Sequence, residues 1–138
     1  MKQNLRQPLG EIVLRTLAMP SDTNANGDIF GGWLMSQMDI GGAILAKEIS
    51  MGRVVTASIE RMTFLKPVRV GDVVTCYAHC IRTGTTSITL QVELWIKKVS
   101  SKPFGKHYCS TEALFIYVAV DGDGIPRSWL KDKSNLMT

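Results

Sequence analysis

The stretch that decides the fold runs from residue 31 to residue 48 and reads GGWLMSQMDIGGAILAKE. Its length and nearly continuous apolar character predict a helix from Gly31 to about Ser50 that is buried all round. Ser36, Gln37 and Asp39, together with four glycines, interrupt an apolar stretch that is barely long enough to cross a bilayer. We therefore expect a buried helix in a globular protein and no membrane span.

Runs rich in Val, Ile, Thr and aromatic residues flank this helix and predict five strands. The runs cover Glu11–Ala18, Arg53–Leu65, Asp72–Arg82, Ser87–Val99 and His107–Val120. Short glycine-containing turns join the last four, which suits antiparallel neighbours. One long helix with five mostly consecutive strands predicts an α+β fold in which a curved antiparallel sheet wraps the helix. The costly pair Gly41-Gly42 indicates that sheet backbone or a ligand approaches the helix closely there.

Length and composition predict one ordinary globular domain. At 138 residues, two independent cores would each lie near the lower size limit for folding alone. The net charge of +4 is dispersed without a run of five or six basic residues, so nucleic-acid binding is not favoured. Three cysteines are an odd number, and the first six residues lack the apolar core of a secretory signal. We expect a cytoplasmic protein whose thiols are reduced.

Asp39 is the only charged residue between Asp28 and Lys47, in the middle of the apolar helix. Small residues share its helical stripe, and the space that they leave suggests a cleft beside the carboxylate. A structural role, in which Asp39 pairs with a basic residue or with backbone donors, is equally consistent with the sequence. Asn24 lies in a polar loop over residues 21–28, where a turn or capping role is the simpler interpretation.

Several other chemistries are not favoured by the sequence. Ser36 is flanked by Leu34 and Met38 where a nucleophile elbow needs glycines. On a strand, Cys76 and Cys80 share one face while His79 points to the other, which does not suit a zinc site. Neither a Walker loop nor a dinucleotide-binding glycine turn is present. We expect no metal and no cofactor.

The segment from Leu17 to Asp39 resembles the bacterial acyl-CoA thioesterases of the hotdog superfamily. The similarity continues through FLKPV at 64–68, VGDVV at 70–74 and VELW at 92–95. The resemblance implies a hotdog domain over residues 8–123, followed by a C-terminal tail over 124–138. It also implies acyl-CoA as the substrate, a homodimer with active sites at its interface as the minimal active unit, and assembly into a hexameric trimer of dimers.

The resemblance assigns the family's helix carboxylate to Asp39 and its loop amide to Asn24, fifteen positions earlier. Asp39 would be a general base on water or a nucleophile that forms a mixed anhydride, and Asn24, from the partner subunit, would orient the water or the carbonyl. Free backbone N–H groups at the helix start would hold the thioester oxygen, with Gly32 catalytic and Gly31 binding. Residues expected to contact coenzyme A phosphates are Arg53, Lys66, Arg82, Ser87 and Lys97, and Lys98 is a further candidate.

Two rival functions remain open from the sequence. A hotdog module could bind acyl-CoA or a nucleotide without catalysis, and measured turnover would discriminate it. A hotdog hydratase or dehydratase resembles a different pattern with a histidine in the active-site loop, whereas residues 21–32 contain none.

Overall fold

The computed structural model describes residues 6–129 and contains the predicted helix and all five predicted strands. The elements are β1 (Glu11–Leu17), the short 3-10 helix η2 (Pro20–Asp22), α1 (Gly31–Ser50), β2 (Val54–Phe64), β3 (Val73–Thr83), β4 (Ser87–Lys97) and β5 (His107–Ala119). The helix ends at Ser50 because Met51 adopts a left-handed conformation with φ of 58°. The predicted bounds differ from these by no more than two residues.

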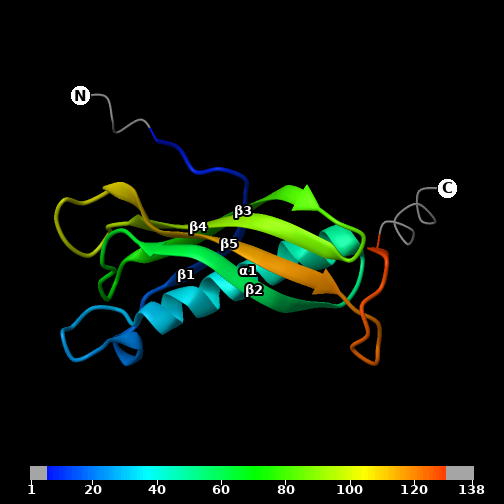
Figure 1. Ribbon diagram of the computed structural model, residues 1–138. Coiled ribbons are helices and arrows are strands. Elements are labelled where there is room, and N and C mark those ends of the chain that lie inside the picture. The colour runs from blue at the N-terminus through cyan, green and yellow to red at the C-terminus, as the bar shows by residue number, and fades with distance from the viewer. Residues whose placement is uncertain (1–5, 130–138) are drawn as a thin grey trace.

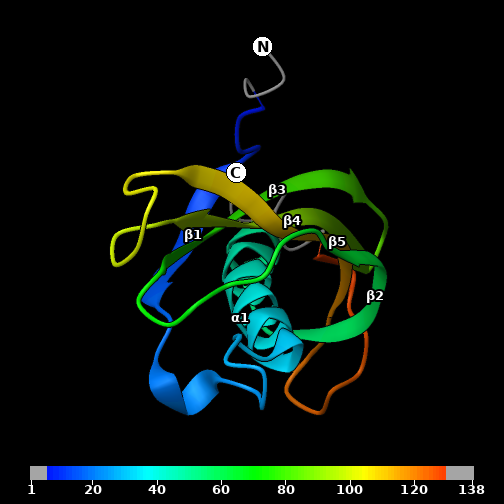
Figure 2. The same cartoon turned by 90° about the vertical axis from the view of Figure 1, so that its left-hand side faces the viewer.

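The five strands form one sheet in the order β1-β3-β4-β5-β2, and all neighbours are antiparallel. The sheet curves around α1, which lies along its concave side (Figure 1, Figure 2). Alternate residues of β4 point toward the helix, and Ile88, Leu90 and Val92 among them have no exposed surface. This arrangement confirms the predicted α+β architecture, a curved antiparallel sheet wrapped around a long helix.

The close approach predicted at Gly41 and Gly42 is present, and the nearest neighbours are side chains of the sheet and not its backbone. A methyl group added to Gly41 would lie 2.8 Å from Val13 Cγ2 and 2.9 Å from Cys76 Sγ. One added to Gly42 would lie 2.4 Å from the hydroxyl of Tyr117. These glycines therefore let the helix lie deep in the sheet.

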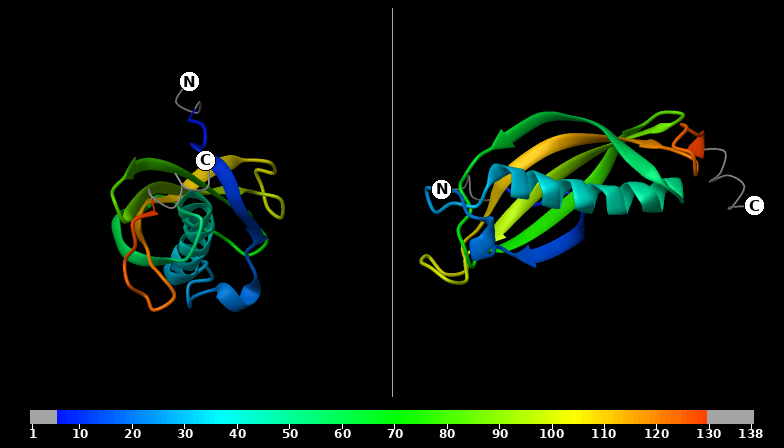
Figure 3. Two further views of the ribbon diagram at one scale, coloured as in Figure 1. Left: turned by 90° about the vertical axis from the view of Figure 1, so that its right-hand side faces the viewer. Right: turned by 90° about the horizontal axis from the view of Figure 1, so that it is seen from below.

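The outer side of α1 is not covered within one chain, which corrects the expectation of a helix buried all round. Ile40 and Ile44 lie one helical turn apart and are 49% and 40% exposed. The edge strand β2 lies beside this face (Figure 3) and leaves Val55 and Phe64 exposed as well. The sheet covers only one side of the helix, and the opposite side of the helix with the adjoining part of β2 is an open apolar surface.

The described part of the predicted tail reaches Trp129, whose side chain is buried in the core at 2% exposure. Its indole N–H donates to the carbonyl of Ser87 at 3.4 Å. Residues 130–138 lie outside the described residues. No helix within residues 6–129 is long and apolar enough to span a bilayer.

Candidate active site

Asp39 is half-buried on α1, and one of its two carboxylate oxygens is held by hydroxyl groups of the sheet. Thr56 on β2 donates to Asp39 Oδ1 at 2.7 Å, and the hydroxyl of Tyr117 on β5 lies 3.1 Å from the same oxygen. The Tyr117 hydroxyl also lies 2.9 Å from the backbone carbonyl of Asp39. Within residues 6–129 no basic side chain pairs with Asp39 and no donor reaches Oδ2.

Tyr117 acts as a hydrogen-bond donor to Asp39 and not as a proton acceptor. Burial of its ring raises the pKa of the phenol far above its usual range, and the neighbouring charge of Asp39 raises the pKa further. The hydroxyl consequently stays protonated at any pH at which the protein would work. With Thr56 it fixes the carboxylate in one orientation and leaves Oδ2 available to a reactant.

The packing of Gly42 against Tyr117 gives a testable consequence. We expect Gly42→Ala to lower the free energy of unfolding by about 1–3 kcal/mol, since its methyl group must displace the Tyr117 hydroxyl from α1. Urea unfolding at a fixed protein concentration measures this loss. Adding Tyr117→Phe should recover part of it, because that change removes the clashing oxygen. The control Gly32→Ala meets nothing within 4 Å and should not be destabilised. Equal losses for Gly42→Ala in both backgrounds would contradict the assigned contact.

The first two amides of α1 are free donors. Trp33 N–H and Leu34 N–H both donate to the carbonyl of Phe30, at 3.1 and 3.2 Å. Among the residues described, no acceptor meets the N–H of Gly31 or Gly32, and no side chain caps the helix. Open space surrounds the Cα of Gly32, whereas Gly31 faces the ring of Phe64. Gly32 therefore presents a donor at the positive end of the helix dipole.

Asn24 holds the loop before α1 together and keeps a free donor. Its Oδ1 accepts the backbone N–H groups of Asn26 and Asp28, at 2.8 and 3.2 Å. This is the turn role that its residue type predicts. No acceptor within the described chain engages the amide nitrogen of Asn24, whose direction is set by the fixed oxygen. The loop can thus offer an oriented N–H donor to a ligand.

The predicted catalytic residues lie in two groups, one at the start of α1 and one near its middle. Asn24, Gly31 and Gly32 lie at the end where Ile29 N–H donates to Val68, which is also the end of Lys66 and Lys97. Asp39 lies eight residues into α1, about 12 Å from Gly31 at 1.5 Å per residue. Within one chain, Asp39 and the helix amides therefore do not serve the same carbonyl group.

The predicted phosphate-binding residues are divided between the two ends of the sheet. Lys97 pairs with Val73 and His107, whereas Ser87 pairs with Val118 at the other end of β4, roughly 30 Å away at 3.3 Å per residue. Arg53 and Arg82 lie at the Ser87 end: Val120 N–H donates to the Arg53 carbonyl, and Arg82 pairs with Thr89. One chain cannot gather all five residues around the same phosphates.

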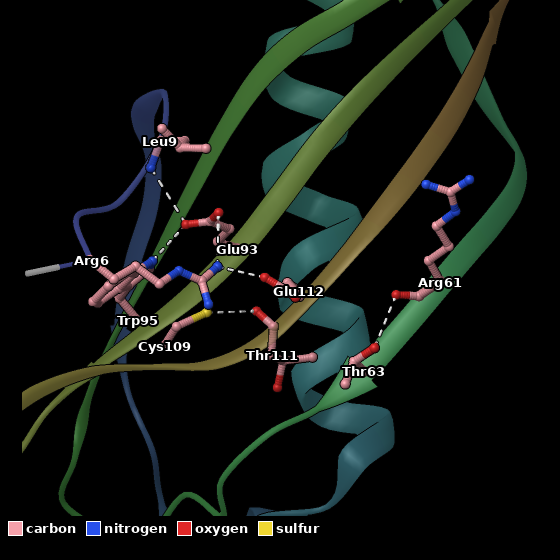
Figure 4. A network of polar contacts seen from close by, with 9 residues as sticks. All are labelled: Arg6, Leu9, Arg61, Thr63, Glu93, Trp95, Cys109, Thr111 and Glu112. Atoms are coloured by element: carbon pink, nitrogen blue, oxygen red, sulfur yellow. Dashed lines mark hydrogen bonds and ion pairs between the residues drawn. The ribbon is translucent and has the colours of Figure 1, made fainter. Parts of the chain in front are cut away.

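A buried acid on the convex side of the sheet was missed by the sequence analysis. Figure 4 shows Glu93 on β4, which is 1% exposed and accepts the indole N–H of Trp95 at 2.7 Å. Arg6 pairs with Glu93 at 3.3 Å and also with Glu112. The sequence contained a sign of this buried acid, since Glu93 is the only charged residue between Ser87 and Ile96. Because its oxygens are engaged, we assign Glu93 to structure and not to catalysis. No three His, Cys, Asp or Glu side chains in residues 6–129 form a metal-type cluster.

A long helix lying in a curved antiparallel sheet, with a carboxylate on the helix and free amides at its start, defines a hotdog protein of the thioesterase type. The family model of the thioesterase superfamily matches residues 26–101, and the chain belongs to that superfamily. It is 74% identical over 120 residues to the acyl-CoA thioester hydrolase YciA of Salmonella typhimurium, covering 87% of this chain and 90% of that protein.

Solved structures of relatives support the same family assignment. A hexameric thioesterase from Yersinia pestis is 70% identical, covers 88% of this chain and 97% of its own, and superposes with a TM-score of 0.84. An acyl-CoA hydrolase from Staphylococcus aureus, solved with butyryl coenzyme A and coenzyme A, is 33% identical with a TM-score of 0.75, covering 83% of this chain and 68% of that one. Variants of the latter carry alanine in place of an aspartate and of an asparagine fifteen positions earlier.

Proposed function

We propose that this chain is an acyl-CoA thioester hydrolase in which Asp39 activates water and Asn24 and Gly32 hold the thioester carbonyl. The observation that carries the proposal is the carboxylate of Asp39 on the hotdog helix. It accepts hydrogen bonds from two hydroxyl groups but has no basic partner among the described residues. The high identity to acyl-CoA thioester hydrolases supports the activity. The two residues substituted in the S. aureus enzyme have the spacing of Asn24 and Asp39, which supports the residue roles.

In this mechanism the carboxylate of Asp39 removes a proton from water as the water oxygen bonds to the thioester carbon. The carbonyl oxygen becomes negative and accepts hydrogen bonds from the Gly32 N–H and the Asn24 amide. Collapse of the tetrahedral intermediate breaks the carbon–sulfur bond. The proton held by Asp39 then returns to the coenzyme A thiolate, which leaves a free carboxylic acid. Coenzyme A is part of the substrate, and no other cofactor or metal takes part.

The site requires a homodimer as its minimal active unit. Asp39 and the helix start lie about 12 Å apart on one helix, so the amides that serve a given Asp39 must come from a second chain. A two-fold axis beside the exposed face of α1 and β2 would set the two helices antiparallel and bring each Asp39 to the partner's helix start. The exposed Ile40, Ile44 and Val55 supply the apolar surface for that contact. By analogy with the hexameric relatives, three dimers would assemble into a hexamer.

A thiol-release assay over short, medium and long acyl-CoAs tests the activity. We expect turnover with at least one chain length, because the carboxylate and the amide donors are complete in the assembled protein. Free acid and coenzyme A should appear in equal amounts. Tight binding of acyl-CoA without release of thiol would contradict hydrolysis and favour the non-catalytic binding module.

The proposed setting is the cytoplasm. Cys76 and Cys109 are buried and Cys80 is exposed, and all three are free thiols. Burial raises the pKa of Cys76 to about 12 and that of Cys109 to about 11, so neither supplies a thiolate nucleophile at neutral pH.

A further inference from the structure

A pocket of about 520 Å³ lies at the end of the sheet that carries the start of α1, and its walls are strongly basic. The loop between β2 and β3 contributes Lys66 and Arg69, and the connection between β4 and β5 contributes Lys98, Lys102 and Lys106. Two of the residues suggested from the sequence, Lys66 and Lys98, are among them. The pocket has the size of a small-molecule site.

The positive charge of the pocket is only partly neutralised. Asp28 pairs with Arg69 at 3.0 Å, and Asp72 pairs with Lys98 at 3.7 Å. Within residues 6–129 no carboxylate pairs with Lys66, Lys102 or Lys106. Three lysines therefore line the pocket without a counter-charge from the described chain, and an anion would be attracted into it.

Two of these lysines converge on one ring. Lys66 Nζ lies 5.4 Å from the centroid of the Tyr108 ring, and Lys106 Nζ lies 5.7 Å from the same centroid. The two ammonium groups are consequently no more than about 11 Å apart, and at low salt each contributes to the positive potential at the other. The Tyr108 hydroxyl donates to the carbonyl of Pro67 at 3.1 Å and anchors this platform. A doubly charged group between the lysines would relieve their repulsion.

The pocket adjoins the proposed catalytic loop. Arg69 pairs with Asp28, and Ile29 N–H donates to the carbonyl of Val68 at 2.9 Å. The β2–β3 loop thus joins the pocket to the loop of Asn24 and to the free amides of α1. The pocket and those amides lie at the same end of the sheet, whereas Arg53, Arg82 and Ser87 lie at the far end.

We propose that this basic pocket, built by Lys66, Arg69, Lys102 and Lys106 around Tyr108, binds the phosphate groups of a nucleotide. Two molecules carry this chemistry: the coenzyme A part of the substrate and a free nucleoside diphosphate. If the bound nucleotide is the coenzyme A part of the substrate, the inference rests on the proposed function. If it is a free nucleoside diphosphate, the inference is independent of that function.

The test compares charge reversals that differ only in position. Lys102→Glu and Lys106→Glu alter exposed side chains of the pocket, and Arg82→Glu makes the same charge change on an exposed residue at the far end of the sheet. Affinities for coenzyme A and for ADP are measured by calorimetric titration of the assembled protein at two salt concentrations. KM is measured for an acyl-CoA and for the corresponding acyl-pantetheine, which has no nucleotide.

Both pocket variants are expected to weaken binding of the nucleotide roughly tenfold relative to Arg82→Glu, with a smaller difference at high salt. A matching rise of KM for acyl-CoA but not for acyl-pantetheine identifies the substrate as the source. Weaker ADP binding with unchanged KM identifies a free nucleotide. The proposal is overturned if both variants bind coenzyme A and ADP as tightly as Arg82→Glu does, or if Arg82→Glu alone causes the loss. If the parent protein hydrolyses neither acyl-CoA nor acyl-pantetheine, the proposed function is contradicted. The measured affinities for coenzyme A and ADP then decide by themselves whether the pocket binds a nucleotide.

Discussion

Replacing Asp39 by asparagine is expected to reduce acyl-CoA hydrolysis by about a hundredfold to ten-thousandfold while the protein still folds and assembles. The amide oxygen of asparagine can still accept the hydrogen bonds from Thr56 and Tyr117. What is lost is the ability to take a proton from water, or to attack the thioester. Thiol release with a saturating acyl-CoA gives kcat, and gel filtration together with urea unfolding shows whether assembly and stability are retained.

Glu48→Gln is the matched control, because it makes the same acid-to-amide change on an exposed position of the same helix. It should keep the parental rate. An Asp39→Asn variant that is folded, assembled and as fast as Glu48→Gln would refute the role of Asp39. The result would also exclude a mixed anhydride at this residue.

Asn24→Ala is expected to reduce hydrolysis by about a hundredfold to a thousandfold, the usual effect of removing one donor to a developing oxyanion. Mixing this variant with Asp39→Asn should then restore activity. A dimer with one chain of each kind has one site with both residues intact and one site with neither. Random exchange of equal amounts places intact pairs in about a quarter of the sites, so about a quarter of the parental activity should return.

Chains are exchanged by unfolding and refolding the two inactive variants together, and each is refolded alone in parallel. No recovery on mixing would show that Asn24 and Asp39 act within the same chain.

Two further variants separate the two roles of Asn24, as an acceptor within its loop and as a donor to the substrate. Asn24→Asp keeps the oxygen that accepts the Asn26 and Asp28 N–H groups but loses the donor, so it should fold and remain slow. Asn26→Ala changes a neighbouring exposed asparagine and should be active.

Local patterns were sufficient to predict the secondary structure of this chain. The apolar run from Gly31 to Ser50 and the β-branched runs that follow it each carry their own periodicity, and glycine turns separate them. The elements therefore appear within two residues of their expected bounds. Asp39 could also be selected as a candidate, because a single charge in an apolar helix is costly to bury, and its catalytic role stays a prediction.

The sequence could not predict which residues meet in space. Nothing near Gly42 indicates that its neighbour is Tyr117, 75 positions later, because that contact depends on the register of β5. The five predicted phosphate ligands were treated as one set because the strand order that separates Ser87 from Lys97 was unknown. The basic pocket needs two distant connections to meet, although four lysines between positions 97 and 106 were a visible sign of it.

The open edge of β2 affects the behaviour of the chain while it is still a monomer. Eleven residues of strand present unpaired backbone groups beside exposed Val55, Phe64 and Ile40, the combination that promotes indiscriminate strand addition. A newly made subunit is therefore at risk of aggregation for as long as it remains alone. Substitutions that slow pairing of the subunits would reduce the yield of recoverable protein before they changed the rate of any site that did form.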